Sequence, residues 1–175
     1  MPNVSTRITA QKNVTTSTSQ AIVPSMLGAI VEFKMHRLDV QVPFLDEFTD
    51  RPFIMVATDH RTGKVLSQSV HCAHVDGRDS VELLDKAIQA LMKSGKHISK
   101  ALVDVGSAFR TPRFVKACRE HGIMPCLAAP RAMCRSEGYV SSLARFLSDA
   151  GNYYAPDVCT LNDVVHTYAD EIYDV

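Results

Sequence analysis

Three extended segments precede the first amphipathic helix, and this order restricts the chain to a small number of folds. Residues 52–58 form a nearly continuous apolar run, and residues 65–70 alternate between apolar and polar side chains. Residues 61–64, Arg-Thr-Gly-Lys, join these two segments as a tight turn. Residues 29–42 before them also alternate in part. The pattern predicts three consecutive antiparallel strands.

A helix and a short strand follow. Asp79 and Glu82 have the spacing of a capping box at a helix start, and Gly95 is placed to end that helix. Its apolar stripe consists of Val81, Leu84, Ile88, Leu91 and Met92. Residues 101–105 are then typical of a buried strand.

A second helix is marked at both ends. Thr111 is a favourable N-cap, Pro112 suits the first helical position, and Gly122 is a typical stop. Residues 123–128 then predict a fifth strand.

Two further helices are predicted over residues 139–147 and 161–172, the second opened by a capping box of Thr160 and Asp163. The complete order is βββαβαβαα. Such an order predicts an α/β protein with a mixed five-stranded sheet and helices on both faces, because crossover helices join the parallel strands. This is the ribonuclease-H-like arrangement.

The length allows one domain. With 175 residues, of which 46% are hydrophobic, the chain can bury a core of ordinary size. We expect a flexible polar segment over residues 1–27 and a folded core domain over residues 28–175. No apolar run approaches the roughly 18 residues of a membrane span, and the N-terminus lacks the basic-then-apolar order of a signal peptide. The sequence therefore predicts a cytoplasmic protein.

The five cysteines form no CxxC pair, and we expect reduced thiols. A metal site at His71, Cys72 and His74 is disfavoured because strand alternation sends Cys72 to the face opposite His71, so a shared ion would need a bend in the strand.

Charge is distributed unevenly along a chain whose formal net charge is zero. Residues 93–145 carry ten Lys or Arg against three Asp or Glu, whereas residues 146–175 carry six acids and no base. A basic stripe of Arg110, Arg113, Lys116 and Arg119 is compatible with phosphate contact, although a solvated helix face is the commoner explanation. The predicted nucleic-acid-binding residues are Arg110, Arg113, Lys116, Arg131 and Arg135.

An ordered series of motifs resembles bacterial DDE transposases related to the phage Mu and TniA-type enzymes, which share the integrase core. Residues 31–42, V-E-F-K-M-H-R-L-D-V-Q-V, resemble their first core strand, W-E-I-D-x-T-x-L-D-V-x-V. Residues 51–59, R-P-F-I-M-V-A-T-D, are similar to G-R-P-x-L-T-x-x-I-D. Residues 101–110, A-L-V-D-V-G-S-A-F-R, resemble the second-aspartate motif D-N-G-x-E-F. The resemblance covers about residues 28 to 175.

The resemblance implies a site of three carboxylates that hold two divalent cations at a phosphodiester. The first falls on Lys34, the second on Asp104 and the third on or near Ser141. Only Asp104 is an acid. Glu137 is the acid nearest the third position, and it lies one turn before Ser141 if the helix includes it.

Lysine at the first position opposes a metal ion. An ammonium about 4 Å from a dication costs roughly 8 kcal/mol at an effective dielectric constant of about 20. We therefore predict that Lys34 pairs with Asp104 and supplies the positive charge that metals would have provided. The expected cofactor is none, with Mg²⁺ or Mn²⁺ at Asp104 only if the chain is active.

Other polar residues near these motifs have structural interpretations. Asp39 points away from the face of Lys34 on a regular strand, and Asp59 ends a strand where Asp is favoured for hydrogen bonding to the turn backbone. His36 shares the face of Lys34 and either lines the site or is a satisfied histidine at the edge of the core.

Three functions remain open. The favoured one is a mobile-element or phage transposase or integrase core that no longer cuts or joins DNA. The second is an active metal-dependent polynucleotidyl transferase with displaced carboxylates at Asp59, Asp104 and Glu137. The third is a protein-interaction module with the acidic segment 149–174 as its surface. The expected partners are DNA, a second copy or other transposition proteins, and no membrane.

Overall fold

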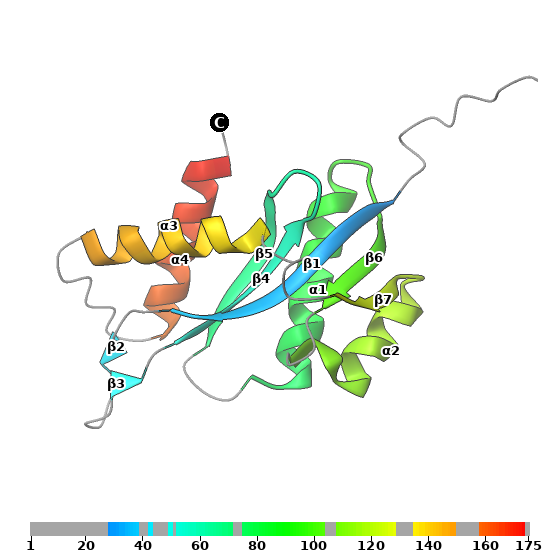
Figure 1. Ribbon diagram of the computed structural model, residues 1–175, viewed down its shortest axis with the longest axis horizontal. Coiled ribbons are helices and arrows are strands. Elements are labelled where there is room, and N and C mark those ends of the chain that lie inside the picture. The colour runs from blue at the N-terminus through cyan, green and yellow to red at the C-terminus, as the bar shows by residue number, and fades with distance from the viewer. Residues whose placement is uncertain are drawn as a thin grey trace, which may run out of the picture.

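The computed structural model describes residues 28–38, 42–43, 49–50, 52–71, 75–103, 108–128, 135–149 and 158–173. The predicted flexible segment 1–27 lies outside these residues. The described chain forms one layered α/β unit with a central sheet (Figure 1). No described helix is long and apolar enough to cross a membrane.

Five strands form the main sheet in the order β5-β4-β1-β6-β7. They are β1 (Ala29–Arg37), β4 (Phe53–Asp59), β5 (Val65–His71), β6 (Ile98–Val103) and β7 (Met124–Leu127). β1 is antiparallel to β4 and parallel to β6, and β4–β5 is antiparallel while β6–β7 is parallel. The predicted mixed five-stranded sheet is confirmed.

The first strand is shorter than expected. β1 ends at Arg37, and Val42 belongs instead to a two-stranded ribbon of β2 (Val42–Pro43) and β3 (Thr49–Asp50). The single strand predicted over residues 29–42 is therefore wrong in its extent, because alternation continues in sequence past the point at which pairing with β4 stops at Phe53.

The β4–β5 turn confirms the structural interpretation of Asp59. Its Oδ1 atom accepts hydrogen bonds from the N–H groups of Arg61 at 2.8 Å and Thr62 at 3.0 Å. Gly63 supplies the positive φ of 76° that the turn requires.

The N-cap of helix α1 (Gly77–Met92) lies three residues before the predicted one. Asp76 is the N-cap, and its side chain accepts from the N–H groups of Arg78 and Asp79. Asp79 returns a hydrogen bond by accepting from the Asp76 N–H at 2.8 Å. The capping box is therefore formed by Asp76 and Asp79, not by Asp79 and Glu82. Both pairs have the required spacing of three residues, so the spacing alone did not distinguish them.

The next helix, α2 (Pro112–Glu120), matches its prediction closely. Thr111 is the N-cap, with Oγ1 accepting from the Phe114 N–H at 3.3 Å, and Gly122 adopts a φ of 68° after the last turn. A short 3-10 helix, η2 (Ala108–Arg110), precedes it.

Both C-terminal helices start earlier than predicted. α3 spans Arg135–Asp149 and α4 spans Val158–Tyr173. The first turn of α3 is polar, so apolar periodicity alone placed its start at Tyr139. Thr160 lies inside α4, which makes the predicted capping box of Thr160 and Asp163 wrong.

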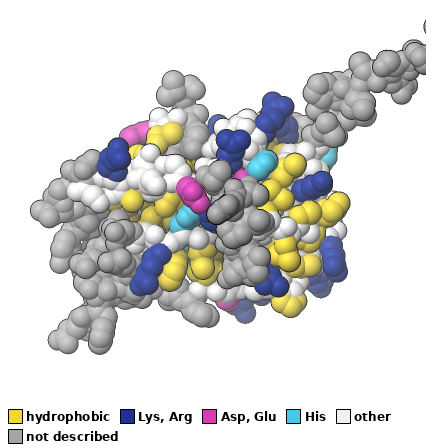
Figure 2. All heavy atoms as spheres, viewed as in Figure 1, with side chains coloured by type: hydrophobic (Ala, Val, Ile, Leu, Met, Phe, Trp, Pro, Cys, Tyr) yellow, Lys and Arg dark blue, Asp and Glu magenta, His cyan; other side chains and the backbone are white. Residues whose placement is uncertain are grey.

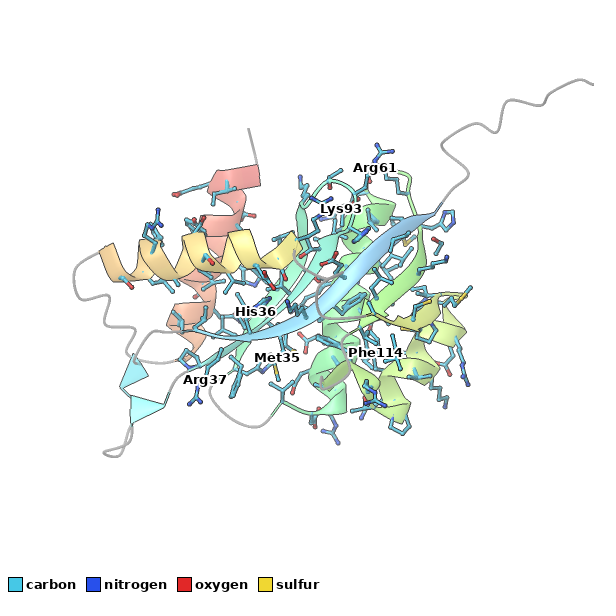
Figure 3. All side chains as sticks on the ribbon, viewed as in Figure 1. Met35, His36, Arg37, Arg61, Lys93 and Phe114 are labelled. Carbon is cyan, nitrogen blue, oxygen red and sulfur yellow. The ribbon has the colours of Figure 1, made fainter. Side chains whose placement is uncertain are left out.

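The sheet is covered on both faces by helices, each with its own apolar core. On one face, α1 and α2 pack around a cluster that includes three aromatic rings in mutual contact at 5.3–5.6 Å. These rings belong to Phe33, Phe109 and Phe114, and Figure 3 shows Phe114 on this side. On the other face, α3 and α4 pack against β4 and β5 through a second cluster that includes Val56, Leu143 and Leu161.

A buried polar link ties α3 and α4 to the edge strand β5. The Gln68 side-chain amide donates to the Val165 carbonyl oxygen on α4 at 2.8 Å. The Tyr139 hydroxyl on α3 donates to Gln68 Oε1. One side chain of β5 therefore holds both helices of this layer.

Candidate functional site

Three polar side chains of β1 face the layer formed by α3. Alternation along the strand places Glu32, Lys34 and His36 on one face, while Phe33 enters the opposite core. Figure 2 shows acidic and histidine side chains close together over β1 and the start of α3. Each of the three polar residues has a partner on α3, and together they define the β1–α3 polar row.

Lys34 and Glu137 form the ion pair at the centre of this row. The Lys34 amine lies 2.7 Å from Glu137 Oε1, and the two side chains are 13% and 55% exposed. The hydrogen bond from Lys34, followed by its charge, lowers the pKa of Glu137. Glu137 lies in the first turn of α3. The prediction that Glu137 could stand near the third carboxylate position required the helix to include it.

His36 makes a second contact with the same turn. Its Nε2 atom lies 2.8 Å from the Oγ atom of the buried Ser136. Figure 3 shows His36 on β1 below the start of α3. His36 therefore lines the site together with Lys34.

Glu32 is the site residue that sequence reasoning missed. Its carboxylate is fully buried, contacts the Nδ1 atom of His60 and accepts from the Arg135 N–H at 3.4 Å. The register places Thr58 opposite Glu32, and its buried Oγ1 has no hydrogen-bond partner among the described residues. The sequence contained one signal for this residue, an acid between the apolar residues Val31 and Phe33 of the first strand. A carboxylate that is buried there needs hydrogen-bond or charge partners.

The second predicted acid, Asp104, lies outside the described residues, so its pairing with Lys34 stays a prediction. The described β1–β6 pairing ends with Phe33 opposite Val103, one position before Lys34 and Asp104 in the sequence. Ser141 lies on α3 one turn after Glu137 and is exposed. The structure thus brings Lys34 and Glu137 together and leaves Ser141 at the surface.

The predicted nucleic-acid-binding residues divide between two helical layers. Arg110 on η2 and Arg113 and Lys116 on α2 are exposed, and Lys116 lies 3.7 Å from Glu120. Arg135 is the exposed first residue of α3, on the other side of the sheet. Arg131 lies outside the described residues.

Potential metal ligands do not cluster among the described residues. No three His, Cys, Asp or Glu side chains among them are grouped as metal ligands, and Glu137 is engaged by Lys34. The triplet of His71, Cys72 and His74 cannot be placed, because residues 72–74 lie outside the described chain. Cys118 and Cys126 are free thiols, and burial raises the pKa of Cys118 to about 12.

The fold is similar to that of viral integrase cores. The HTLV-2 integrase catalytic core domain in complex with magnesium superposes with a TM-score of 0.55 at 18% identity, covering 86% of this chain and 90% of that one. A chain of the simian T-cell lymphotropic virus intasome in complex with PP2A regulatory subunit B56 gamma gives a TM-score of 0.57 at 17% identity, covering 81% and 46%. No protein-family model and no curated protein matches the sequence.

The chain therefore has the ribonuclease-H-like α/β fold of an integrase catalytic core. It spans about half the length of the intasome chain, 46%. At these identities the likeness establishes the fold, and the chemistry must be argued from this chain's own residues.

Proposed function

We propose that this chain is the core of a mobile-element or phage transposase or integrase that binds DNA but neither cuts nor joins it. The observation that carries the proposal is the 2.7 Å ion pair between Lys34 and Glu137. In the motif resemblance, Lys34 takes the place of the first carboxylate, and Glu137 is the acid nearest the third. Lys34 and Glu137 therefore neutralise each other at two positions where the transposase motifs have acids.

The charge of Lys34 opposes metal binding in two ways: it repels a metal ion, and it engages the carboxylate of Glu137. A dication about 4 Å from the ammonium would meet a repulsion of about 8 kcal/mol at an effective dielectric constant of about 20. The same ammonium lowers the proton affinity of Glu137 and occupies one of its oxygens. We further propose that Asp104 shares the Lys34 ammonium, which would neutralise a second carboxylate.

The proposal of DNA binding is supported by where the exposed arginines lie along the chain. Arg110 and Arg113 follow the carboxyl end of β6, and Arg135 follows that of β7. Ligands of open α/β sheets bind outside the carboxyl ends of the strands. Arginine is also suited to phosphate because its guanidinium presents several donors in one plane.

An active enzyme with displaced carboxylates has less support. Asp59 is only 8% exposed, and its Oδ1 atom already accepts two N–H groups of the β4–β5 turn. A metal ion at this position would compete with the turn for the same carboxylate. Without Asp59, the proposed set of displaced carboxylates is reduced from three acids to two, Asp104 and Glu137.

Two measurements test the proposal. A gel shift with duplex DNA should show binding that weakens as salt rises, and a nicking and strand-transfer assay with Mg²⁺ or Mn²⁺ should show no product. An Arg113→Gln, Arg135→Gln double variant should bind DNA more weakly, whereas the matched Arg61→Gln, Arg145→Gln variant, at two exposed arginines outside the basic stripe, should bind as the wild type does. Product formation by the wild type would refute the loss of chemistry. The absence of a shift at low salt would refute DNA binding and favour the protein-interaction module.

A further inference from the structure

A groove runs along the outer edge of β5, away from the β1–α3 polar row. β5 is the last strand of the sheet on this side, and α1 and α4 contact it from its two faces. The space between the two helices is a cavity of about 780 Å³. Residues Val65 to Gln68 of β5 line it, together with the last turns of α1 and the second half of α4. We call this cavity the β5-edge groove.

Positive charge predominates around the β5-edge groove. Lys64, Lys86, Lys93, Lys96 and His166 line it, against Asp59 and Asp170. Asp59 is committed to the turn, and Lys86 lies 2.8 Å from Glu82. Within the described part of the chain, no ion pair holds Lys64, Lys93 or Lys96. Figure 3 shows Lys93 and Arg61 at the same end of the molecule, near the β4–β5 turn.

The backbone of β5 presents hydrogen-bonding groups to this groove. The Val70 N–H donates to Asn162 Oδ1 on α4 at 3.2 Å, so it points away from β4. The pairing with β4 is regular between Ser67 and His71, and N–H directions alternate along a strand. The Gln68 N–H therefore points out of the sheet as well. Asn162 covers the edge at Val70, and the groove begins where that cover ends.

Two features favour a peptide over a nucleic acid as occupant. An unpaired strand edge between two walls is the geometry at which an extended peptide adds a strand. None of the residues that line the groove is Phe, Tyr or Trp, whereas single-stranded nucleic acid is held largely by stacking on such side chains.

We propose that the β5-edge groove binds an extended acidic peptide, which adds to the sheet as a strand beside β5. Side chains of such a strand alternate between the α1 wall and the α4 wall. Those that face α1 meet Lys86 and Lys93. Those that face α4 meet His166, Ala169 and Asp170, and Asp170 disfavours an acid on that side. The ligand is therefore a segment in which acidic residues alternate with small or β-branched apolar ones. This role goes beyond the proposed DNA function and uses none of its residues.

The test uses the full chain and a fluorescein-labelled Glu-Val repeat of about eight residues. Anisotropy should report binding that weakens with salt, because lysines supply much of the attraction. A Lys93→Glu, Lys96→Glu variant should bind about ten-fold more weakly, and the matched Arg119→Glu, Arg145→Glu variant should bind as the wild type does. N-methylation of alternate peptide bonds should abolish binding, because strand addition requires the backbone groups.

Four outcomes would overturn the proposal. They are no binding by the wild type, equal binding of the N-methylated peptide, equal loss in both charge variants, and stronger binding of a short single-stranded DNA that displaces the peptide. Sedimentation velocity adds one more comparison. A dimer that the Lys93→Glu, Lys96→Glu variant alone dissociates would assign the groove to a second copy of this chain and also overturn the proposal.

Discussion

The amine of Lys34 on β1 donates a hydrogen bond to the carboxylate of Glu137 on α3 across 2.7 Å, joining residues 103 positions apart in the sequence. The lysine is largely buried and the glutamate is half exposed, at 13% and 55%. The contact connects the central strand of the sheet to the first turn of the helix that covers it. It neutralises charge at the site and connects the first turn of α3 to β1.

Titration of Glu137 should report this contact. Lys34 lowers the pKa of Glu137 below the ordinary glutamate value of 4.5, so the pair persists above that value and is lost as pH falls through the lower pKa of the folded state. Carbon-detected NMR should show a Glu137 midpoint below that ordinary value. In Lys34→Met the midpoint should return toward the ordinary value, and an unchanged midpoint would contradict the ion pair.

Replacement of Lys34 by aspartate should create metal affinity. The change removes the opposing ammonium, releases Glu137 and supplies an acid at the first position of the motif. Calorimetry with Mn²⁺ should detect binding to Lys34→Asp and none to the wild type. Lys34→Met, which removes the charge without adding a ligand, is the matched control and should bind far more weakly. Equal Mn²⁺ binding by the wild type would contradict the charge argument.

The cap of α2 should have a measurable effect on stability. Thr111 Oγ1 accepts from the Phe114 N–H, which has no partner inside the helix. Thr111→Ala should lower the free energy of unfolding by about 1 kcal/mol in urea denaturation, whereas Thr111→Ser should retain most of it. Equal losses in the two variants would mean that the methyl group of Thr111, not its hydroxyl, matters.

The buried link at Gln68 should be sensitive to one hydroxyl. Tyr139→Phe leaves Gln68 Oε1 without that donor, and a buried unsatisfied acceptor costs about 1 to 3 kcal/mol. Tyr168→Phe is the matched control, because no hydrogen bond of its hydroxyl is present in the described part of the chain. Thermal unfolding should separate the two variants clearly. Equal melting temperatures would show that the link adds nothing.

Local patterns predicted the fold well, because strand alternation and cap residues act over short distances. Thr111, Pro112 and Gly122 gave both ends of α2, and alternation placed Lys34 and His36 on one face. Errors arose where two patterns competed within a few residues. Asp76 and Asp79 form the capping box of α1, and the same spacing recurs between Asp79 and Glu82.

The partners within the site could not be predicted in the same way. Lys34 and Glu137 meet only because α3 crosses β1, and His60 reaches Glu32 only because the β4–β5 turn folds back beside β1. The sequence predicted a pair of Lys34 with Asp104, which lies outside the described residues. The role of Glu32 was not predicted, because an acid in an alternating strand is expected to face solvent unless a helix is known to cover it.

The two layers of helices bear on how the protein is made. During synthesis, α1 and α2 emerge before α3 and α4, because they precede them in the sequence. Until α3 and α4 have been made, no helix is available to cover the face of the sheet on which they pack. On that bare face Glu32, Lys34 and His36 interrupt what would otherwise be a continuous apolar surface. Charged side chains reduce the tendency of an exposed apolar strand to aggregate. We therefore expect the β1–α3 polar row to protect β1 from aggregation before α3 and α4 have been synthesised.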